Sequence, residues 1–560
     1  MFTFVTFEEL TGRHVKLDAI EKILRRTNLS QVLRFAAHWL SRSENVTKSQ
    51  RKVDSEYVAC HFRGDWAPAA KSLLASGRVF VAPQLFHVLM KLALLVSPPD
   101  GALLSADTAA FLILALGDHV GGRVSDASPN EALHLDGVPG ALARELISNQ
   151  HFNYPQDPAL AMAMYTRRWR EIPLEDPHPE LGSVDELYHT SVGVSFDEME
   201  LVVVGLWAHV MSNNEPLVRR HPLFNKFPIQ PERLDRVMQL ISRNVPQMRR
   251  AILEDMQQLG GGFDWSVAPF ERTPIVQLPG GYLVMDPRLL AARIFGWLPY
   301  WDIASALRAE GKNREVGQFR DYSGRISERY AMEVLQSASS GHLDRRLFFE
   351  CDLIAAYGRK RKVVDAVIDY GDSWVVLDIS TRQLVRESVA GTSGERLKGD
   401  FEALVGRKAK QLAATISALR EDESKLTGVR GPIARKFLPV IVASEGFPVN
   451  PAVSVIIEDL LVREGLLQEA DIAPLQVIDT TELEMVEALE ESGASNFSIL
   501  LQGKVRASLH RSSLRDYILI ERRLRPGRSS RISGIWRKPF DRVLDAMRPI
   551  WEEERKLRET

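Results

Sequence analysis

The sequence predicts an α/β protein in which a mainly helical N-terminal region is followed by a mixed β-sheet core flanked by helices. Three observations lead to this fold class. Apolar residues recur at helical spacing through most of residues 1–272. Two apolar runs with strict alternation then flank Gly371-Asp372, which is typical of a β-hairpin. Strand and helix patterns alternate after this hairpin, as they do where a sheet is extended in parallel.

The length of the chain predicts several domains. At 560 residues the chain is too long for one typical core. We divide it into four regions: a mainly helical recognition or scaffold region (1–272), a β-hairpin with a connecting helix (273–312), a sheet domain (313–503) and a basic C-terminal arm (504–560). The helical region has a soft internal break near 171–195, where Pro, Asp and Glu accumulate.

Charge, cysteine content and hydropathy narrow the class of protein. The formal net charge of -2 excludes a globally basic nucleic-acid binder but allows a local basic patch. The two cysteines lie far apart in the sequence, so we expect no disulfide framework and a reducing, cytoplasmic location. No apolar stretch reaches the length of about 18 residues that a membrane span requires, so we expect no membrane partner.

The N-terminal region is predicted to be helical from apolar runs bounded by Gly or Pro. The clearest runs cover 30–40, 82–96, 105–119 and 195–211. A further run that starts at Pro231 also has helical character. No arrangement of Ser, His and Asp typical of a hydrolase stands out in this half. We therefore interpret it as a scaffold or recognition module that binds protein partners.

Residues 273–312 are expected to form a hairpin and a helix. The apolar segments PIVQL and YLVMD enclose Pro279-Gly280-Gly281, a sequence typical of a tight turn. The segment RLLAARIFGWL that follows has helical spacing. This region leads into the sheet domain.

The hairpin around Gly371-Asp372 has a register that the sequence itself predicts. If these two residues form the loop, Tyr370 faces Ser373 and Asp365 lies directly opposite Asp378. Side chains of a strand alternate between its two faces. One face is therefore wholly apolar and is expected to be core (Val364, Ala366, Ile368, Val375, Leu377 and Ile379). The other face carries Asp365 and Asp378 together with Val363, Val367, Asp369, Trp374, Val376 and Ser380.

Asp365 and Asp378 lie opposite each other on one face of the hairpin, and this arrangement indicates a candidate cation-binding site. Aspartate is a poor strand former, and directly opposed like charges, whose β-carbons are about 4.5–5.5 Å apart, repel each other. A bound hard cation would turn the repulsion into attraction. The alternative is a solvated face whose carboxylates serve solubility. The local pattern leaves both interpretations open.

The hairpin is similar to a known signature. A strand bearing Asp, a tight turn, and a strand ending in Asp/Glu-x-Lys resemble the restriction-endonuclease-like, or PD-(D/E)XK, nuclease superfamily. The matching residues are Asp365 and Asp378-Ile379-Ser380, and Ser380 stands where the family has its lysine. The resemblance implies that 313–503 is a PD-(D/E)XK nuclease-like domain. It also implies that Asp365 and Asp378 hold Mg²⁺ or Mn²⁺.

The order of elements after the hairpin also resembles the superfamily core. A polar connection over 386–400 leads to a helix over 401–419 and then to a strand over 437–443. Strand, strand, helix and strand in that order are what the superfamily has. A further strand that opens a helix at Thr480 or Thr481 would extend the same sheet.

The predicted helix carries two further candidate site residues, Lys408 and Gln411. On a helical wheel Lys408 lies at the edge of the buried stripe, whereas Lys410 points nearly the opposite way. The resemblance implies that Lys408 supplies the positive charge that Ser380 lacks. Gln411 matches the first residue of a Q-x-x-x-Y pattern of the family, with Thr415 in the place of tyrosine. The alternative is that Lys408 merely extends from the helix edge to solvent.

The segment ahead of the hairpin supplies an acidic and a basic candidate. The helical pattern GRISERYAMEVLQSA resembles the first helix of the superfamily, in which Glu328 is the candidate acid, and an ordinary surface glutamate is the alternative. Residues 347–357 are expected to form the first strand. A basic turn beside the site would neutralise a phosphate backbone. Its basic residues are Arg359, Lys360, Arg361 and Lys362.

The C-terminal arm is the most basic part of the chain. Residues 504–548 contain thirteen Lys and Arg against four Asp and Glu, with aromatic residues between them. Arg522, Arg523 and Arg525 are the candidates for nucleic-acid contacts, because arginine and aromatic side chains suit phosphates and bases. The alternative is an arm that packs on acidic residues of the N-terminal half.

Two functions are compatible with these observations. The first is a metal-dependent endonuclease or exonuclease that hydrolyses phosphodiester bonds of nucleic acid, with DNA favoured over RNA, and uses Mg²⁺ or Mn²⁺. The second is a catalytically inactive nuclease-like subunit that binds nucleic acid or assembles a bacterial complex, for example in defence against foreign DNA. The serine at position 380 favours the second function.

Overall fold

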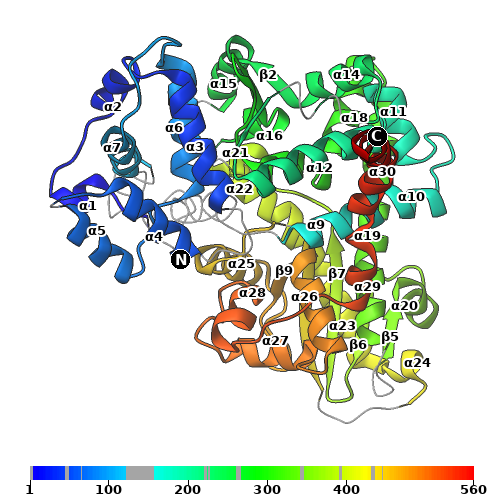
Figure 1. Cartoon of the computed structure of the whole chain (residues 1–560). Coiled ribbons are helices and arrows are strands. Elements are labelled where there is room, and N and C mark those ends of the chain that lie inside the picture. Colours follow the sequence, from blue (N-terminus) through cyan, green and yellow to red (C-terminus); the bar gives the residue numbers. More distant parts are fainter. Residues whose placement is uncertain are drawn as a thin grey trace. The chain divides into compact units, whose positions relative to one another are not determined.

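The protein is an α/β protein in which the described residues form two compact units, each with one small mixed sheet (Figure 1). The computed structural model describes residues 4–43, 50–64, 66–120, 157–219, 224, 227–259, 266–340, 346–389, 394–429, 435–443 and 446–559. Within these ranges, unit 1 comprises the residues up to 317 and those from 537 onward, and unit 2 comprises 318–536. Unit 2 is therefore inserted in the sequence of unit 1.

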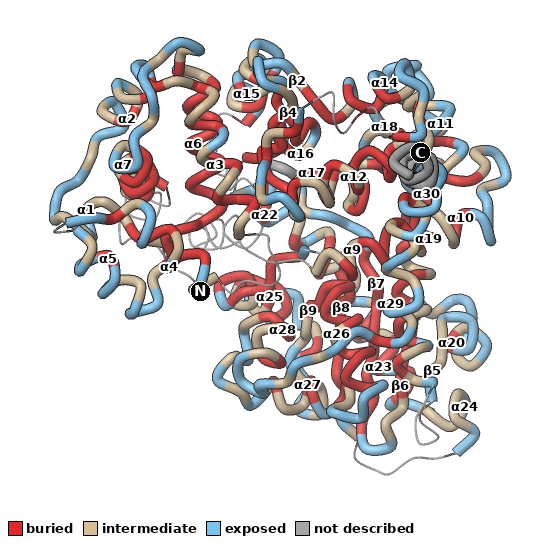
Figure 2. Tube along the Cα trace, viewed as in Figure 1, coloured by how far each residue is buried: buried red, intermediate tan, exposed pale blue. Residues whose placement is uncertain are grey.

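The core of unit 1 forms around α6 (Pro83–Val96), which is buried from Pro83 to Leu94 (Figure 2). A helix that is apolar all round is expected inside a core, and α3 (Leu29–Ser43) and α7 (Ala106–Gly117) pack against it. The other helices of unit 1 are α1 (Phe7–Thr11), α2 (Leu17–Leu24), α4 (Gln50–His61), α5 (Trp66–Ala75), α9 (Pro158–Tyr165), the π-helix η2 (Thr166–Glu171), α10 (Ile172–Glu175), α11 (Val184–Val192), α12 (Phe196–Asn213), α14 (Pro231–Ile241), α15 (Val245–Leu259), α16 (Ala268–Arg272), α17 (Pro287–Phe295), α18 (Leu298–Ala309) and α30 (Lys538–Glu559).

The sheet of unit 1 contains the predicted hairpin. Its strands β3 (Ile275–Leu278) and β4 (Gly281–Val284) pair antiparallel with Leu278 opposite Gly281, so the hairpin is confirmed and its turn consists of Pro279 and Gly280. The two outer strands, β1 (Leu217–Val218) and β2 (Ser242–Asn244), were not predicted, and they complete the order β1-β4-β3-β2.

The helical character predicted for the run from Pro231 is confirmed, but the run forms two helices. The run splits into α14 and α15, and β2 lies between them. Asn244 and Gln247 cap the start of α15 reciprocally, because the Gln247 amide donates to Asn244 Oδ1 at 2.9 Å and the Asn244 amide donates to Gln247 Oε1 at 3.1 Å. Such paired side-chain and backbone bonds are a start signal for a new helix.

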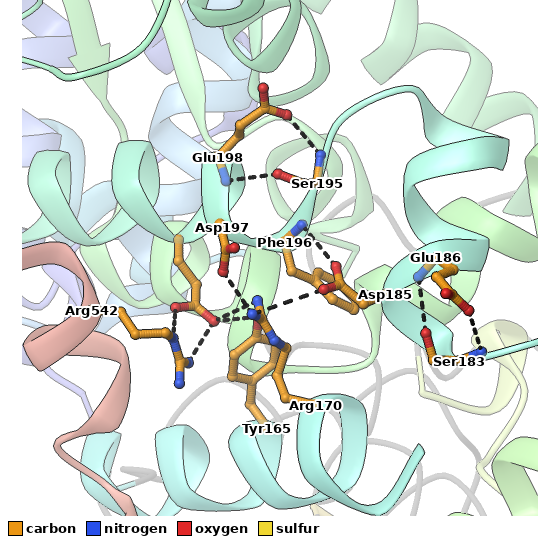
Figure 3. Close-up of polar contacts among 11 residues, drawn as sticks. Tyr165, Arg170, Ser183, Asp185, Glu186, Ser195, Phe196, Asp197, Glu198 and Arg542 are labelled. Carbon is orange, nitrogen blue, oxygen red and sulfur yellow. Dashed lines mark hydrogen bonds and ion pairs between the residues drawn. The ribbon is translucent and has the colours of Figure 1, made fainter. Parts of the chain in front are cut away.

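The C-terminal helix α30 belongs to unit 1 and packs along α12. Figure 3 shows Arg542 of α30 in the same cluster as Tyr165 and Arg170. The carboxylate of Glu200 on α12 accepts two hydrogen bonds of 2.7 Å from Arg542 and is only 1% exposed. Tyr165 donates to the same carboxylate at 2.7 Å, and Arg170 donates at 3.3 Å. Every oxygen of this buried carboxylate therefore has a donor.

Unit 2 is built on a five-stranded sheet with the order β5-β6-β7-β8-β9. The first three strands are antiparallel neighbours, whereas β8 and β9 extend the sheet in parallel. The strands are β5 (Arg346–Phe349), β6 (Ala366–Asp369), β7 (Ser373–Ser380), β8 (Lys436–Ala443) and β9 (Gln476–Asp479). The helices are α20 (Glu350–Tyr357), α21 (Arg386–Val389), α22 (Gly394–Phe401), the π-helix η3 (Glu402–Gly406), α23 (Arg407–Asp422), α24 (Ser424–Thr427), α25 (Pro451–Glu464), α26 (Thr480–Glu491), α27 (Phe497–Val505), α28 (Leu514–Asp516), the π-helix η4 (Tyr517–Glu521) and α29 (Ser530–Ile535), and α19 (Asn313–Ser339) enters the unit from unit 1.

Two predictions for unit 2 were wrong in detail. Residues 347–357 do not form one strand, because the chain turns into α20 after Phe349 and Asp352 Oδ2 accepts a hydrogen bond of 2.9 Å from the amide of Phe349. The polar connection over 386–400 contains α21 and α22, and residues 390–393 within it lie outside the described residues. The predicted helix over 401–419, the strand over 437–443 and the start of a helix at Thr480 are confirmed.

Both faces of this sheet are covered. Val367, Trp374 and Val376 pack against α23 and α25, whereas Ser373 on the other face meets Ser498 of α27 with 2.7 Å between the two Oγ atoms. Every residue of β7 is buried. The structure therefore confirms the apolar face as core and excludes the solvated face that the sequence left open.

Candidate active site

The hairpin has the register that the sequence predicts. The observed pairs run from Ala366 opposite Leu377 to Asp369 opposite Trp374. The amide of Tyr370 donates to the carbonyl of Ser373 at 2.9 Å, and Gly371 adopts a φ of +84°, which favours glycine. One further step in this register places Asp365, in the bend before β6, opposite Asp378 on β7.

Asp365 and Asp378 converge on one cation, the ammonium of Lys408. Lys408 Nζ donates to Asp378 Oδ1 at 2.6 Å and lies 3.9 Å from Asp365 Oδ2. Asp378 is fully buried and Asp365 is 9% exposed. Asp365 Oδ2 also accepts a hydrogen bond of 2.6 Å from the amide of Ile379, which fixes the side chain against β7. The two carboxylates therefore lie on the same side of the sheet, where one cation reaches both.

One oxygen of Asp378 has no donor. Within the described residues, Asp378 Oδ2 is buried and has no hydrogen-bond partner. Burial raises the pKa of Asp378, and the adjacent carboxylate of Asp365 raises it further, while Lys408 acts in the opposite direction. A buried carboxylate oxygen without a donor costs free energy, so the site is electrostatically incomplete as it stands.

The helix α23 supplies Lys408 and also holds the chain that leads to Asp365. Gln411 Nε2 donates to the carbonyl of Val363 at 3.3 Å, and Thr415 Oγ1 accepts from the amide of Val364 at 3.1 Å. Lys408, Gln411 and Thr415 are spaced so that they share one helix face. The half-buried Gln411 thus contacts the backbone beside the site, and Thr415 makes a second backbone contact.

Glu328 lies next to the carboxylate of Asp365, and Glu350 contacts Asp365 through the backbone. Burial and the carboxylate of Asp365 raise the pKa of Glu328 to about 7, with a further contribution from Glu350. The amide of Glu350 donates to the carbonyl of Asp365 at 3.0 Å. The sequence analysis missed Glu350 because it assigned this residue to the interior of a strand, whereas Glu350 begins α20.

The basic residues proposed for phosphate contacts lie in two settings. In the turn before Asp365, Arg359, Lys360 and Lys362 are exposed, whereas Arg361 pairs with Glu421 at 3.0 Å. Arg522, Arg523 and Arg525 are exposed as well, and Arg525 Nη1 donates to the carbonyl of Leu519 at 2.7 Å.

Much of the remaining charge of the C-terminal arm is compensated within the molecule. In unit 2, Arg531 pairs with the buried Glu487 at 2.8 Å. In unit 1, Arg542 pairs with Glu200 and Lys538 pairs with Glu171. These contacts match the alternative interpretation of the arm for residues 538 and 542, which contact acidic residues of the N-terminal half.

The donor set at the hairpin fits a hard divalent cation with few protein ligands. Among the described residues, no group of three or more His, Cys, Asp and Glu side chains is arranged to hold a metal ion. Mg²⁺ in phosphate chemistry is usually bound by only one or two carboxylates, together with water and substrate phosphates. Asp365 and Asp378 satisfy that requirement, and the orphaned Asp378 Oδ2 is an oxygen that a metal could use.

Comparison with known proteins assigns no family to this chain. No protein-family model matches the sequence, and no curated protein and no solved structure matches it at a significant level. In the part of the chain that the structure describes, we find no helix with the length and apolar character needed to span a bilayer. The site is therefore interpreted from its own geometry.

Proposed function

We propose that this protein is a metal-dependent nuclease whose active centre is formed by Asp365, Asp378 and Lys408. The observation that carries the proposal is the convergence of two nearly buried aspartates on one cation, with Asp378 Oδ2 left without a donor. A pair of buried carboxylates this close together is unfavourable unless a cation or a proton on one of them compensates the charge. Perturbed acidic groups of this kind mark functional sites.

The topology of unit 2 supports the nuclease class. The order α19, β5, β6, β7, α23 and β8, with three antiparallel strands followed by a parallel one, is the arrangement expected of a PD-(D/E)XK core. The short helix α20 between β5 and β6 is an addition to that pattern. Lys408 reaches the site from α23, so the positive charge that Ser380 lacks has a source on a neighbouring element.

Each residue has a defined role in this proposal. Asp365 and Asp378 would hold Mg²⁺ or Mn²⁺, and the bound metal would lower the pKa of a water molecule and offset charge on the attacked phosphate. Lys408 would supply a further positive charge beside the phosphate. The exposed residues Arg359, Lys360 and Lys362 would bind the nucleic-acid backbone.

The assay compares cleavage of nucleic acid by matched variants of the full chain. Plasmid DNA, linear oligonucleotides and RNA are incubated with the wild type, Asp378→Asn and Lys408→Met in Mg²⁺ or Mn²⁺. We expect the wild type to cleave DNA, and we expect each variant to cleave it at least about 100-fold more slowly. Asp378→Asn removes a charged metal ligand, and Lys408→Met removes a positive charge that would stabilise the transition state. Lys410→Met is the control, since Lys410 is exposed and pairs with Glu464 at 3.0 Å, away from the aspartates.

The inactive nucleic-acid-binding subunit is the alternative outcome of the same assay. Ser380 at the family's lysine position is the observation that favours it. Binding of oligonucleotides without cleavage in either metal, unchanged in Asp378→Asn, would support that function and refute the nuclease proposal.

A further inference from the structure

Lys408 occupies the space that a metal between Asp365 and Asp378 would need. Its ammonium donates to Asp378 Oδ1 at 2.6 Å and lies 3.9 Å from Asp365 Oδ2, so it already acts as the counter-ion of both carboxylates. A divalent cation bound by the same two carboxylates, on these oxygens or on Asp378 Oδ2, would be repelled by this ammonium. The bound lysine therefore competes with the metal.

The ammonium of Lys408 is able to move away from the two aspartates. The side chain of Lys408 is 21% exposed, whereas that of Asp378 is fully buried, so Lys408 is the more accessible member of the pair. Lysine carries its charge on a flexible four-carbon stem with rotatable donors, which allows the ammonium to move without moving α23. A phosphate group of nucleic acid offers it a new anionic partner.

We propose that Lys408 is a displaceable internal cation that couples metal binding to phosphate binding. The inference rests on the proposed metal site and adds that metal binding there depends on phosphate binding. Without nucleic acid, Lys408 holds Asp378 and weakens metal binding. When a phosphate backbone draws the ammonium away, the carboxylates are released to the metal. Because coupling between two ligands is reciprocal, metal must strengthen nucleic-acid binding by the same factor.

The chain offers matched variants for this inference. Lys408→Met removes the charge and keeps an extended apolar stem, and Lys408→Arg keeps the charge in the same position. Lys410→Met removes a charge two residues away on the same helix, where the side chain is 62% exposed and pairs with Glu464. Asp378→Asn removes the metal ligand itself.

The experiment is a titration of the full chain with Mn²⁺, followed by calorimetry, with and without a non-cleavable phosphorothioate oligonucleotide. We expect the oligonucleotide to tighten Mn²⁺ binding to the wild type by about tenfold, within the usual range of such couplings. Lys408→Met should bind Mn²⁺ about tenfold more tightly than the wild type without oligonucleotide and should gain clearly less than the wild type from its addition, because only the direct contact of phosphate with the metal remains. Lys408→Arg and Lys410→Met should retain the coupling.

The outcomes separate this inference from the function on which it rests. If Lys408→Met binds Mn²⁺ no more tightly than the wild type, or gains as much affinity from the oligonucleotide as the wild type does, Lys408 is not the coupling element. If Asp378→Asn binds Mn²⁺ as the wild type does, or if no variant binds it, the metal site itself is refuted. A melting curve of each variant without metal verifies that it is folded.

Discussion

The two units each bury a carboxylate among charged neighbours, but they complete its interactions differently. In unit 1, Glu200 accepts hydrogen bonds from Arg542, Arg170 and Tyr165 and is 1% exposed. In unit 2, Asp378 has one lysine on one oxygen and, within the described residues, no partner on the other. Both carboxylates are buried, yet only the first is saturated with donors.

This difference separates a structural carboxylate from a candidate ligand. A saturated buried cluster is internally complete, and it joins α30 to α12 in unit 1 (Figure 3). An unsaturated carboxylate beside a second acid stores unfavourable energy that a bound cation would relieve. Burial alone therefore does not distinguish these two carboxylates, whereas the number of donors around each of them does.

The largest expected effect on stability comes from replacing each buried carboxylate, Glu200 and Asp378, by the corresponding amide. Glu200→Gln should lower the free energy of unfolding by about 3 kcal/mol, because a neutral amide with a single acceptor oxygen replaces the buried carboxylate that accepts hydrogen bonds from Arg542, Arg170 and Tyr165. Asp378→Asn should lose no more than about 1 kcal/mol without metal, because it removes an unfavourable charge together with one hydrogen-bond partner. Denaturant unfolding of the two variants provides the comparison.

The control for the first variant is Arg548→Ala, which removes an exposed partner of Asp545 on the same helix as Arg542. Its unfolding midpoint should stay close to that of the wild type, since exposed pairs contribute little. If Asp378→Asn lowers the free energy of unfolding as much as Glu200→Gln does, Asp378 has a structural role as well.

A smaller effect is expected at Thr415, which holds the backbone beside the unsaturated carboxylate. Thr415→Val should cost about 1–3 kcal/mol, because the buried amide of Val364 loses its acceptor. Thr415→Ser keeps the hydroxyl and should retain Mn²⁺ affinity, whereas Thr415→Val should weaken it as Asp365 loses its fixed position. Equal Mn²⁺ affinity in the two variants would show that Thr415 does not position the site.

The smallest effect concerns the pH dependence of stability through Glu328. Its pKa is raised from 4.5 to about 7 in the folded protein. Between these values the folded state holds a proton that the unfolded chain has released, so stability should fall as pH rises from 4.5 to about 7. Melting temperatures over this range should decline less steeply in Glu328→Gln. Identical slopes for the two proteins would contradict the assignment.

The local features of the site could be predicted from the sequence. Alternation and a two-residue loop specify the hairpin register, because a shift by one residue would move every side chain to the wrong face. The opposition of Asp365 and Asp378 follows from that register. Helical periodicity likewise placed Lys408 at the edge of its helix and Lys410 in solvent, and both positions are observed.

Other features depend on contacts that the sequence does not reveal. An apolar run such as 347–357 fits either a strand or a packed helix, and the cap by Asp352 decides for α20 after Phe349. The partners of the basic arm also lie far away in sequence, as the pairing of Arg531 with Glu487 shows. Local charge counts therefore overstated how much of the arm is available to nucleic acid.

The most direct test of the shared cation is diffraction from crystals of the full chain grown with Mn²⁺, with data collected for the anomalous signal of manganese. We predict an anomalous peak between the carboxylates of Asp365 and Asp378, with the ammonium of Lys408 displaced from Asp378 Oδ1. A map without a peak there, in which Lys408 still contacts Asp378 at saturating Mn²⁺, would contradict the metal site.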